Sequence, residues 1–286
     1  MTTATAFAPR GPGLGVRLRN LLLPAFTGLL LLLLFSPIGV MIAFSFNDPA
    51  GRQNITWQGF TLRNYVDVWG RSEITDAMTT SLAVATISTI VATTFGTMIG
   101  LALTRFEFRG RWIMNLLIFI PITAPEIILG ASLLTLWVSF DVERGFLTIV
   151  AAHIMFNISF VVVTVRARLA GFNRSLEEAG MDLYADGRTT FWKVTFPIIF
   201  PGILSAALLA FALSIDDYVI TSFSAGHTVT FPLWVFGASR VGIPPEVNVL
   251  GTLIFMVAFV FIGVQLWAQR RQGRTAEAAP VTMVGR

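Results

Sequence analysis

The chain has 286 residues, of which 55% are hydrophobic and only 13% are charged. Soluble domains carry about a quarter charged residues, so this composition indicates an integral membrane protein and excludes a pair of soluble domains. The net charge of +4 comes without a dense Lys/Arg run, which argues against a nucleic-acid partner, and the absence of cysteine excludes disulfides and thiol chemistry. With only His153 and His227 as nitrogen ligands, no metal site is expected.

Six apolar stretches are each long enough to cross a bilayer as a helix, which needs about 20 residues. They cover residues 21–46, 77–103, 113–138, 147–165, 198–222 and 247–267. The predicted fold class is therefore an all-α integral membrane protein whose six transmembrane helices form one domain over residues 21–269. Residues 1–20 precede it, and residues 270–286 form an Ala-, Arg- and Gly-rich tail that we expect to be disordered.

The basic residues predict the orientation of these spans, because cytoplasmic segments of membrane proteins carry an excess of Lys and Arg. With the N-terminus inside, the outer segments hold only Arg52, Arg63, Arg71, Arg144 and Arg240. The cytoplasmic segments hold the other fifteen: Arg10, Arg17, Arg19, Arg105, Arg109, Arg111, Arg166, Arg168, Arg174, Arg188, Lys193, Arg270, Arg271, Arg274 and Arg286. Both termini and the segment 166–197 are therefore predicted to be cytoplasmic.

This cytoplasmic segment, residues 166–197, is long for a connection inside a compact membrane domain, which indicates a function. Ser175 with Glu178 three residues later has the spacing of a capping box and predicts a short helix over residues 176–183. Glu178 and Asp182 lie one turn apart on that helix and can face a basic partner. The same features also fit an amphipathic helix that lies on the membrane without a partner.

The Glu178-Ala179-Gly180 motif and the residues after it resemble the coupling loop of binding-protein-dependent ABC importer permeases. In that loop, Glu-Ala-Ala is followed by Gly and then by two prolines. Gly180 replaces the second Ala, and Tyr184 stands where that family usually has Gly, with Gly187 three residues later. The resemblance implies a type I ABC importer permease architecture. It implies that the ATPase is contacted through Glu178, Ala179, Gly180, Asp182, Leu183, Ala185 and Gly187.

Further segments resemble the PotC-type permeases of spermidine/putrescine importers, namely residues 160–172, 214–217, 222–226, 231–233 and 241–248. This resemblance implies a polyamine importer in a bacterial inner (plasma) membrane. It implies three partners: a second, homologous permease, an ATPase dimer and an extracytoplasmic solute-binding protein. The chain has no Gly-x-x-x-x-Gly-Lys-Ser/Thr phosphate loop, so we expect it to be no enzyme and to carry no cofactor. ATP and Mg would then act on the partner ATPase.

Ionisable residues within the predicted spans give an independent hypothesis about the substrate. Glu126, Asp216 and Asp217 are the acids there, and no Lys or Arg accompanies them. At about 1.5 Å rise per residue, Glu126 and Asp216 lie roughly 21–23 Å above the inner edge of the membrane. Together with Tyr218 they predict a negative zone of the translocation path, which would attract a polycation.

These acids also have simpler interpretations. Asp216 and Asp217 are adjacent, about 100° apart on a helix, so we do not expect both to face the path, and one of them can pair with Arg240 or with the partner permease. Glu126 follows Pro121 and Pro125 and can instead serve at a hinge or an interface. His153 is more simply a packed, hydrogen-bonded residue than a proton carrier.

Three other functions stay open at this point. The solute can be another small cation or amine, since relatives that carry other solutes share much of the pattern. An ion-coupled secondary transporter would use the buried acids and need no ATPase, but no inverted repeat supports it. An intramembrane hydrolase has little support, because the chain lacks His-Glu-x-x-His. A tightly bound ATPase would distinguish the importer from the last two.

Overall fold

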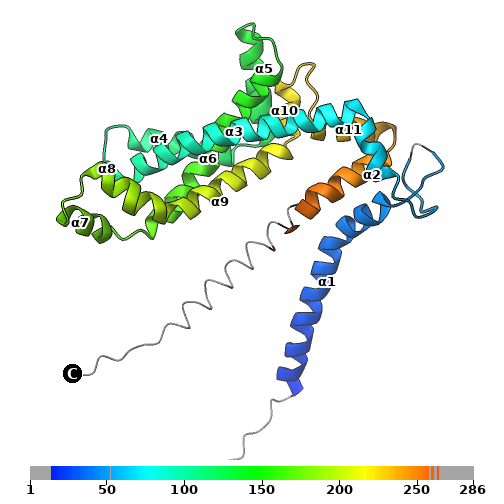
Figure 1. Ribbon diagram of the computed structural model, residues 1–286, viewed down its shortest axis with the longest axis horizontal. Coiled ribbons are helices and arrows are strands. Elements are labelled where there is room, and N and C mark those ends of the chain that lie inside the picture. The colour runs from blue at the N-terminus through cyan, green and yellow to red at the C-terminus, as the bar shows by residue number, and fades with distance from the viewer. Residues whose placement is uncertain (1–13, 52, 258, 261–262, 264–286) are drawn as a thin grey trace, which may run out of the picture. The chain divides into compact units, whose positions relative to one another are not determined.

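The computed structural model describes residues 14–51, 53–257, 259–260 and 263, and this part of the chain is almost entirely helical (Figure 1). The one β feature among these residues is an isolated bridge between Asn47 and Phe60, so the all-α prediction is confirmed. The helices are α1 (Leu14–Ser45), α2 (Asn64–Asp67), η1 (Val68–Gly70), α3 (Ser72–Arg105), α4 (Arg111–Thr123), α5 (Glu126–Ser139), α6 (Phe146–Ala170), α7 (Ser175–Asp182), α8 (Gly187–Thr190), η2 (Phe191–Thr195), α9 (Phe196–Ile215), α10 (Val219–Ser224), α11 (Phe231–Val241) and the helix Pro245–Val257.

The chain forms two compact units. A terminal unit contains α1, the segment up to Gly70 and the described residues from Gly242 onward, and a central unit runs from Arg71 to Val241. In the terminal unit, the Asn47 side chain makes hydrogen bonds across the predicted outer loop. Its Nδ2 donates to Asn54 Oδ1 at 2.6 Å, and its Oδ1 accepts from the Gln58 backbone N–H at 2.7 Å. The buried Asn47 side-chain amide thereby supplies hydrogen-bond partners that the loop backbone would otherwise find in a sheet.

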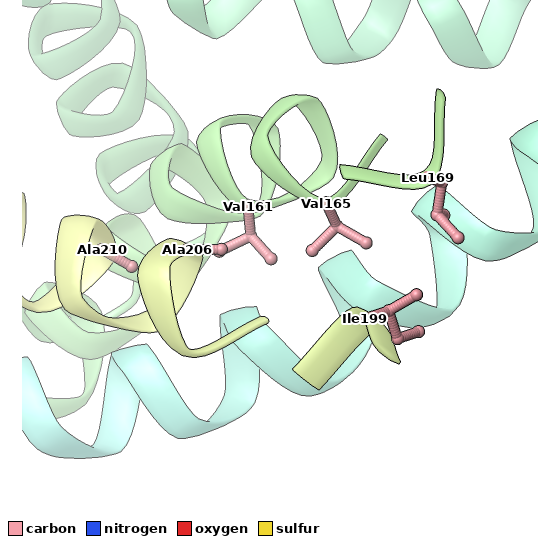
Figure 2. Close-up of a cluster of buried hydrophobic side chains, with 6 residues drawn as sticks. All are labelled: Val161, Val165, Leu169, Ile199, Ala206 and Ala210. Atoms are coloured by element: carbon pink, nitrogen blue, oxygen red, sulfur yellow. The ribbon is translucent and has the colours of Figure 1, made fainter. Parts of the chain in front are cut away.

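The central unit is built on three long helices, α3, α6 and α9, which pack against one another. Val161, Val165 and Leu169 of α6 meet Ile199, Ala206 and Ala210 of α9 in a fully buried cluster (Figure 2). Glycines bring α3 close to α6: a Cβ on Gly96 would lie 2.6 Å from Val161 Cγ1. Small residues are the usual device for close helix packing in a bilayer, where apolar side chains gain little from leaving lipid.

The predicted third span, residues 113–138, is wrong as one continuous helix. The structure has two helices instead, α4 and α5, which meet at an angle of 110°. Pro125 causes this break, because a proline removes a backbone donor and forces the preceding residue into extended conformation; Ala124 has φ −74° and ψ 139°. Glu126 is therefore the first residue of α5 and lies at the corner of the bent pair.

The predicted fifth span, residues 198–222, is also interrupted. α9 ends at Ile215, Asp216 to Tyr218 form a break, and α10 starts at Val219. Before α9, residues Phe191–Thr195 adopt a π-helix that leads directly into Pro197 at the start of α9. A wider turn at this place is consistent with a proline that cannot donate to the preceding turn.

Four helices in the described part are long and apolar enough to span a membrane, or five if the bent pair α4–α5 counts as one span. They confirm the predicted first, second, fourth and, with its interruption, fifth spans. The sixth predicted span, 247–267, is described only in part, and the predictions for residues 1–20 and 270–286 lie largely or wholly outside the described residues. The six-span count and the cytoplasmic termini thus stay predictions.

Candidate functional site

The predicted cytoplasmic loop is held to the helical core through Glu177, the third residue of α7. Its carboxylate forms an ion pair with Arg105, the last residue of α3, and accepts a hydrogen bond from the Thr195 hydroxyl in the π-helix. Arg174 adds a hydrogen bond to the Thr104 carbonyl at 3.3 Å. These contacts attach the short helix α7 to α3 and to the π-helix that precedes α9.

The residues predicted to contact an ATPase lie mostly on the outside of this loop. Five of them are exposed: Glu178, Ala179, Asp182, Leu183 and Gly187. Gly180 is partly buried, because its α-carbon faces Thr190 and Val194 of the same chain, and Ala185 is also partly buried. The loop therefore presents five of the seven predicted residues to solvent, and Gly180 packs against α8 and the π-helix of the same loop.

Exposed apolar side chains accompany these residues. Leu176, Met181 and Leu183 are exposed, and the Tyr184 side chain is 100% accessible. We call Leu176, Met181, Leu183 and Tyr184 the apolar loop patch. Exposed large apolar side chains on a polar loop are typical of a surface that a protein partner or a membrane covers.

One local detail of the loop differs from the sequence-based expectation, and a second concerns the backbone at Tyr184. Ser175 is not the helix cap: Arg174 holds that position without a side-chain cap, and Asn173 Oδ1 accepts from the Ser175 amide at 3.1 Å. Tyr184, at the position usually held by Gly, has φ 63°. This left-handed conformation is the one that glycine adopts without steric cost, so Tyr184 takes a backbone conformation that favours glycine.

The helix α8 begins with a side-chain cap that the sequence analysis did not identify. Asp186 Oδ1 accepts from the Thr189 amide at 3.0 Å. Hydrogen bonds from Thr189, first its side chain and then its backbone, hold the pKa of Asp186 below its usual value. The charged cap therefore persists at neutral pH and is favourably placed at the helix N-terminus.

At the break between α9 and α10, a buried polar network joins four helices. His153 Nδ1 lies 2.6 Å from Ser214 Oγ, and Nε2 lies 2.9 Å from Thr221 Oγ1 and 3.4 Å from Asp217 Oδ2. Asp217 Oδ2 accepts from both the amide and the hydroxyl of Thr221, each at 2.7 Å, and Ser214 Oγ lies 3.1 Å from Ser88 Oγ. This arrangement satisfies each of these polar groups inside the helical core, as buried polar groups require.

The two adjacent acids, Asp216 and Asp217, have different environments, and only Asp217 belongs to this network. Asp217 turns inward and closes the first turn of α10, with 8% of its side chain exposed, and it pairs with His153 rather than with Arg240. Asp216, which ends α9, is exposed. The Arg240 guanidinium instead lies 4.7 Å from the ring centroid of Phe236, which also contacts the Tyr218 ring at 4.4 Å.

Glu126 and Asp216 share two properties in the structure, since each lies at a helix break and each is exposed. α5, which Glu126 begins, packs on α10 through Gly130 and Phe223. Among the described residues, no hydrogen bond or ion pair joins Glu126 to Asp216. The structure thus separates Asp217, a buried acid held by His153 and Thr221, from Glu126 and Asp216, which are exposed at helix breaks.

Sequence reasoning missed Glu177 and the partners of His153. On the predicted loop helix, Glu177 lies about 100° from Glu178, so a helical wheel already places it on a different face. Its partner Arg105 is 72 residues away, and no local pattern predicts that pairing. The partners of His153, Ser214 and Thr221, are likewise brought to it only by helix packing.

The arrangement of the helices is that of an ABC importer permease. A solved bacterial ABC transporter involved in the import of the acidic polysaccharide alginate matches it with a TM-score of 0.64, covering 93% of this chain and 99% of that chain at 18% identity. Residues 92–271 match the family model described as binding-protein-dependent transport system inner membrane component. The chain belongs to this family and is a multi-pass protein of the inner membrane.

Two curated relatives from Escherichia coli (strain K12) extend this result. The spermidine/putrescine transport system permease protein PotC is 35% identical over 230 residues, which cover 80% of this chain and 86% of the relative. The putrescine transport system permease protein PotI is 37% identical over 242 residues, which cover 82% of this chain and 85% of the relative. The resemblance identified from the sequence is thereby confirmed at the level of the family.

Proposed function

We propose that this chain is one permease of an ATP-driven importer of polyamines such as spermidine and putrescine. The observation that carries the proposal is the similarity to two permeases of polyamine systems over about four fifths of the chain. The charge pattern supports it independently. Glu126 and Asp216 expose carboxylates at helix breaks, and no Lys or Arg is among the fully buried residues that the structure describes.

A carboxylate within a membrane span costs about 2.5–3.5 kcal/mol at the bilayer centre, so it is retained where it faces water, a partner or a ligand. A polyamine carries several ammonium groups separated by apolar methylenes, which match spaced carboxylates and aromatic rings. We assign this role to Asp216 and the nearby Tyr218 ring, which lie on either side of Asp217 in the sequence, and to Glu126 on a second helix.

The same proposal assigns the apolar loop patch to a separate ATPase subunit. Glu178 and Asp182 supply charge next to Leu176, Met181 and Leu183, a combination that fits a groove with an apolar floor and a basic rim. Through Glu177, movement of α7 would reach α3 and α9, the two helices whose ends carry the loop contacts. The second permease and the extracytoplasmic solute-binding protein complete the proposed assembly, and ATP with Mg acts on the ATPase.

A purification from native membranes tests this assembly. The affinity-tagged chain is expected to co-purify with an ATPase subunit and a second permease as a stable complex. The ATPase activity of that complex is expected to rise when the solute-binding protein loaded with spermidine or putrescine is added. A complex without an ATPase, or an activity that responds to a loaded binding protein for another solute class and not to polyamines, would reject the proposal.

A further inference from the structure

Asn157 on α6 is a buried polar residue that the proposed transport function does not use. Its side chain is 0% exposed, and neither Nδ2 nor Oδ1 has a hydrogen-bond partner among the described residues. Transfer of an amide into an apolar interior is strongly unfavourable unless its donors and acceptor are paired. A fully buried asparagine with both ends unpaired therefore points to a ligand that the helices themselves do not supply.

The position of Asn157 follows from its neighbours along α6. His153, Asn157 and Val161 are spaced by four residues and share one face of the helix. His153 on this face contacts Ser214 of α9, and Val161 packs with Ala206 and Ala210 of α9 (Figure 2). Because Asn157 lies between them, it faces the junction of α3, α6 and α9.

The facing part of α3 carries more unpaired polar atoms. Gly96 lies against Val161, and one turn earlier on both parallel helices this register places Asn157 beside Ala92 and Thr93. The buried hydroxyls of Thr89, Thr93 and Thr97, which recur every fourth residue, also have no partner among the described residues. Their neighbour Thr94 differs, since it is exposed and its Oγ1 donates to the Ile90 carbonyl at 2.8 Å.

The chemistry of the unpaired groups selects the ligand. A cation would satisfy Oδ1 of Asn157 and leave the Nδ2 donors unpaired, whereas an anion would do the reverse. A water molecule both donates and accepts, and buried waters typically make about three hydrogen bonds to otherwise unpaired groups. Ala206 and Ala210 on α9 offer no polar atom at this level, so the water must be shared between α6 and α3.

We propose that Asn157 and Thr93 bind an internal water molecule at the α3–α6–α9 junction. The water lies one helical turn along α6 from His153 and joins the two most extensively packed helices of the central unit. It extends the polar interior below the His153 network and pairs an amide that would otherwise oppose helix packing.

Two measurements on the complete importer in lipid nanodiscs test the site. A high-resolution cryo-EM map of the unmodified complex is expected to show water density within hydrogen-bond distance of both the Asn157 amide and the Thr93 hydroxyl. This map requires no variant, so it decides the question even if a substitution prevents assembly. A map in which the Asn157 amide bonds directly to protein atoms, or in which no density lies beside it, would overturn the proposal.

Thermal unfolding of variants supplies the second measurement. Thr93→Val keeps the side-chain shape and is expected to lower the Tm of the wild-type complex, but to have little effect in Asn157→Leu, where the water is already lost. The matched control Thr94→Val should give the same small shift in both backgrounds. Additive effects of Thr93→Val and Asn157→Leu, or a Tm that depends specifically on the Na⁺ concentration through Asn157, would contradict a shared water.

Discussion

Arg105 at the end of α3 and Glu177 on α7 form an ion pair that attaches the loop 166–197 to the helical core. The Glu177 side chain is 12% exposed and that of Arg105 is 27% exposed, so the pair is only partly screened by water. The guanidinium also lies 5.8 Å from the ring centroid of Phe172, which adds an apolar and cation–π contact. These contacts attach the loop to the end of α3.

Glu177→Gln is expected to lower the stability of the assembled importer by about 1–3 kcal/mol, because it leaves Arg105 without its charged partner and weakens the contact to Thr195. ATP-driven transport should fall by more than the amount of complex, since α7 loses its attachment to α3. The matched control is Glu178→Gln, which changes an exposed neighbour and should leave the Tm unchanged. Equal Tm values for the two variants in thermal unfolding would show that the ion pair is not structural.

Tyr184 lies in the left-handed region with φ 63°, and it is fully exposed to solvent. Tyr184→Gly removes the steric cost of that backbone conformation, about 1–2 kcal/mol, and adds chain entropy to the unfolded state, so we expect a net gain in stability of up to about 1 kcal/mol. Leu183→Gly, one residue earlier with φ −87°, should lose stability. Thermal unfolding of the permease pair without the ATPase checks both, and a destabilised Tyr184→Gly would contradict the interpretation.

The two glycines that bring α3 to α6 differ in how much room they leave. A Cβ on Gly96 would lie 2.6 Å from Val161 Cγ1, whereas one on Gly100 would lie 3.4 Å from Val165 Cγ1. Gly96→Ala should therefore destabilise the central unit by about 1–3 kcal/mol through overpacking. Gly100→Ala should be close to neutral, because the gain in helix propensity offsets a mild contact. Similar Tm shifts for the two variants would mean that the helices adjust more freely than the structure indicates.

The adjacent acids Asp216 and Asp217 are expected to fail in different ways. Asp217→Asn weakens the contacts to His153 and Thr221 and should lower the stability of the complex by about 1–3 kcal/mol. Asp216→Asn should leave the Tm unchanged and reduce uptake of polyamines. Measuring Tm and uptake on the same preparations separates the two effects, and the assignment is wrong if the roles are reversed.

The sequence predicts the helices of this protein well where they depend on continuous apolar runs or on a local motif. The runs at 21–46, 77–103 and 147–165 correspond to α1, α3 and α6, and the loop helix predicted over 176–183 is α7 within one residue at each end. Prediction was wrong where one proline or a polar turn interrupts such a run. Pro125 bends the α4–α5 pair by 110°, and Asp216 to Tyr218 separate α9 from α10.

The candidate sites show the same limit. Helical spacing predicts that Glu178 and Asp182 share one face of the loop helix, and both are exposed in the structure. The environments of Glu177, His153 and Asp217 depend on residues brought together by packing, such as Ser88 and Ser214, whose hydroxyls are 126 residues apart in sequence. No local pattern specifies such contacts, so the difference between Asp216 and Asp217 became visible only in the structure.

Uptake of labelled spermidine and putrescine into proteoliposomes tests the central claim most directly. Liposomes that contain this chain, its partner permease and the ATPase, supplied with loaded solute-binding protein outside and ATP inside, are expected to accumulate at least one of the two polyamines. Omission of ATP or of the ATPase should abolish uptake. Transport by this chain alone under an ion gradient, or a complete complex that moves another solute and neither polyamine, would contradict the account.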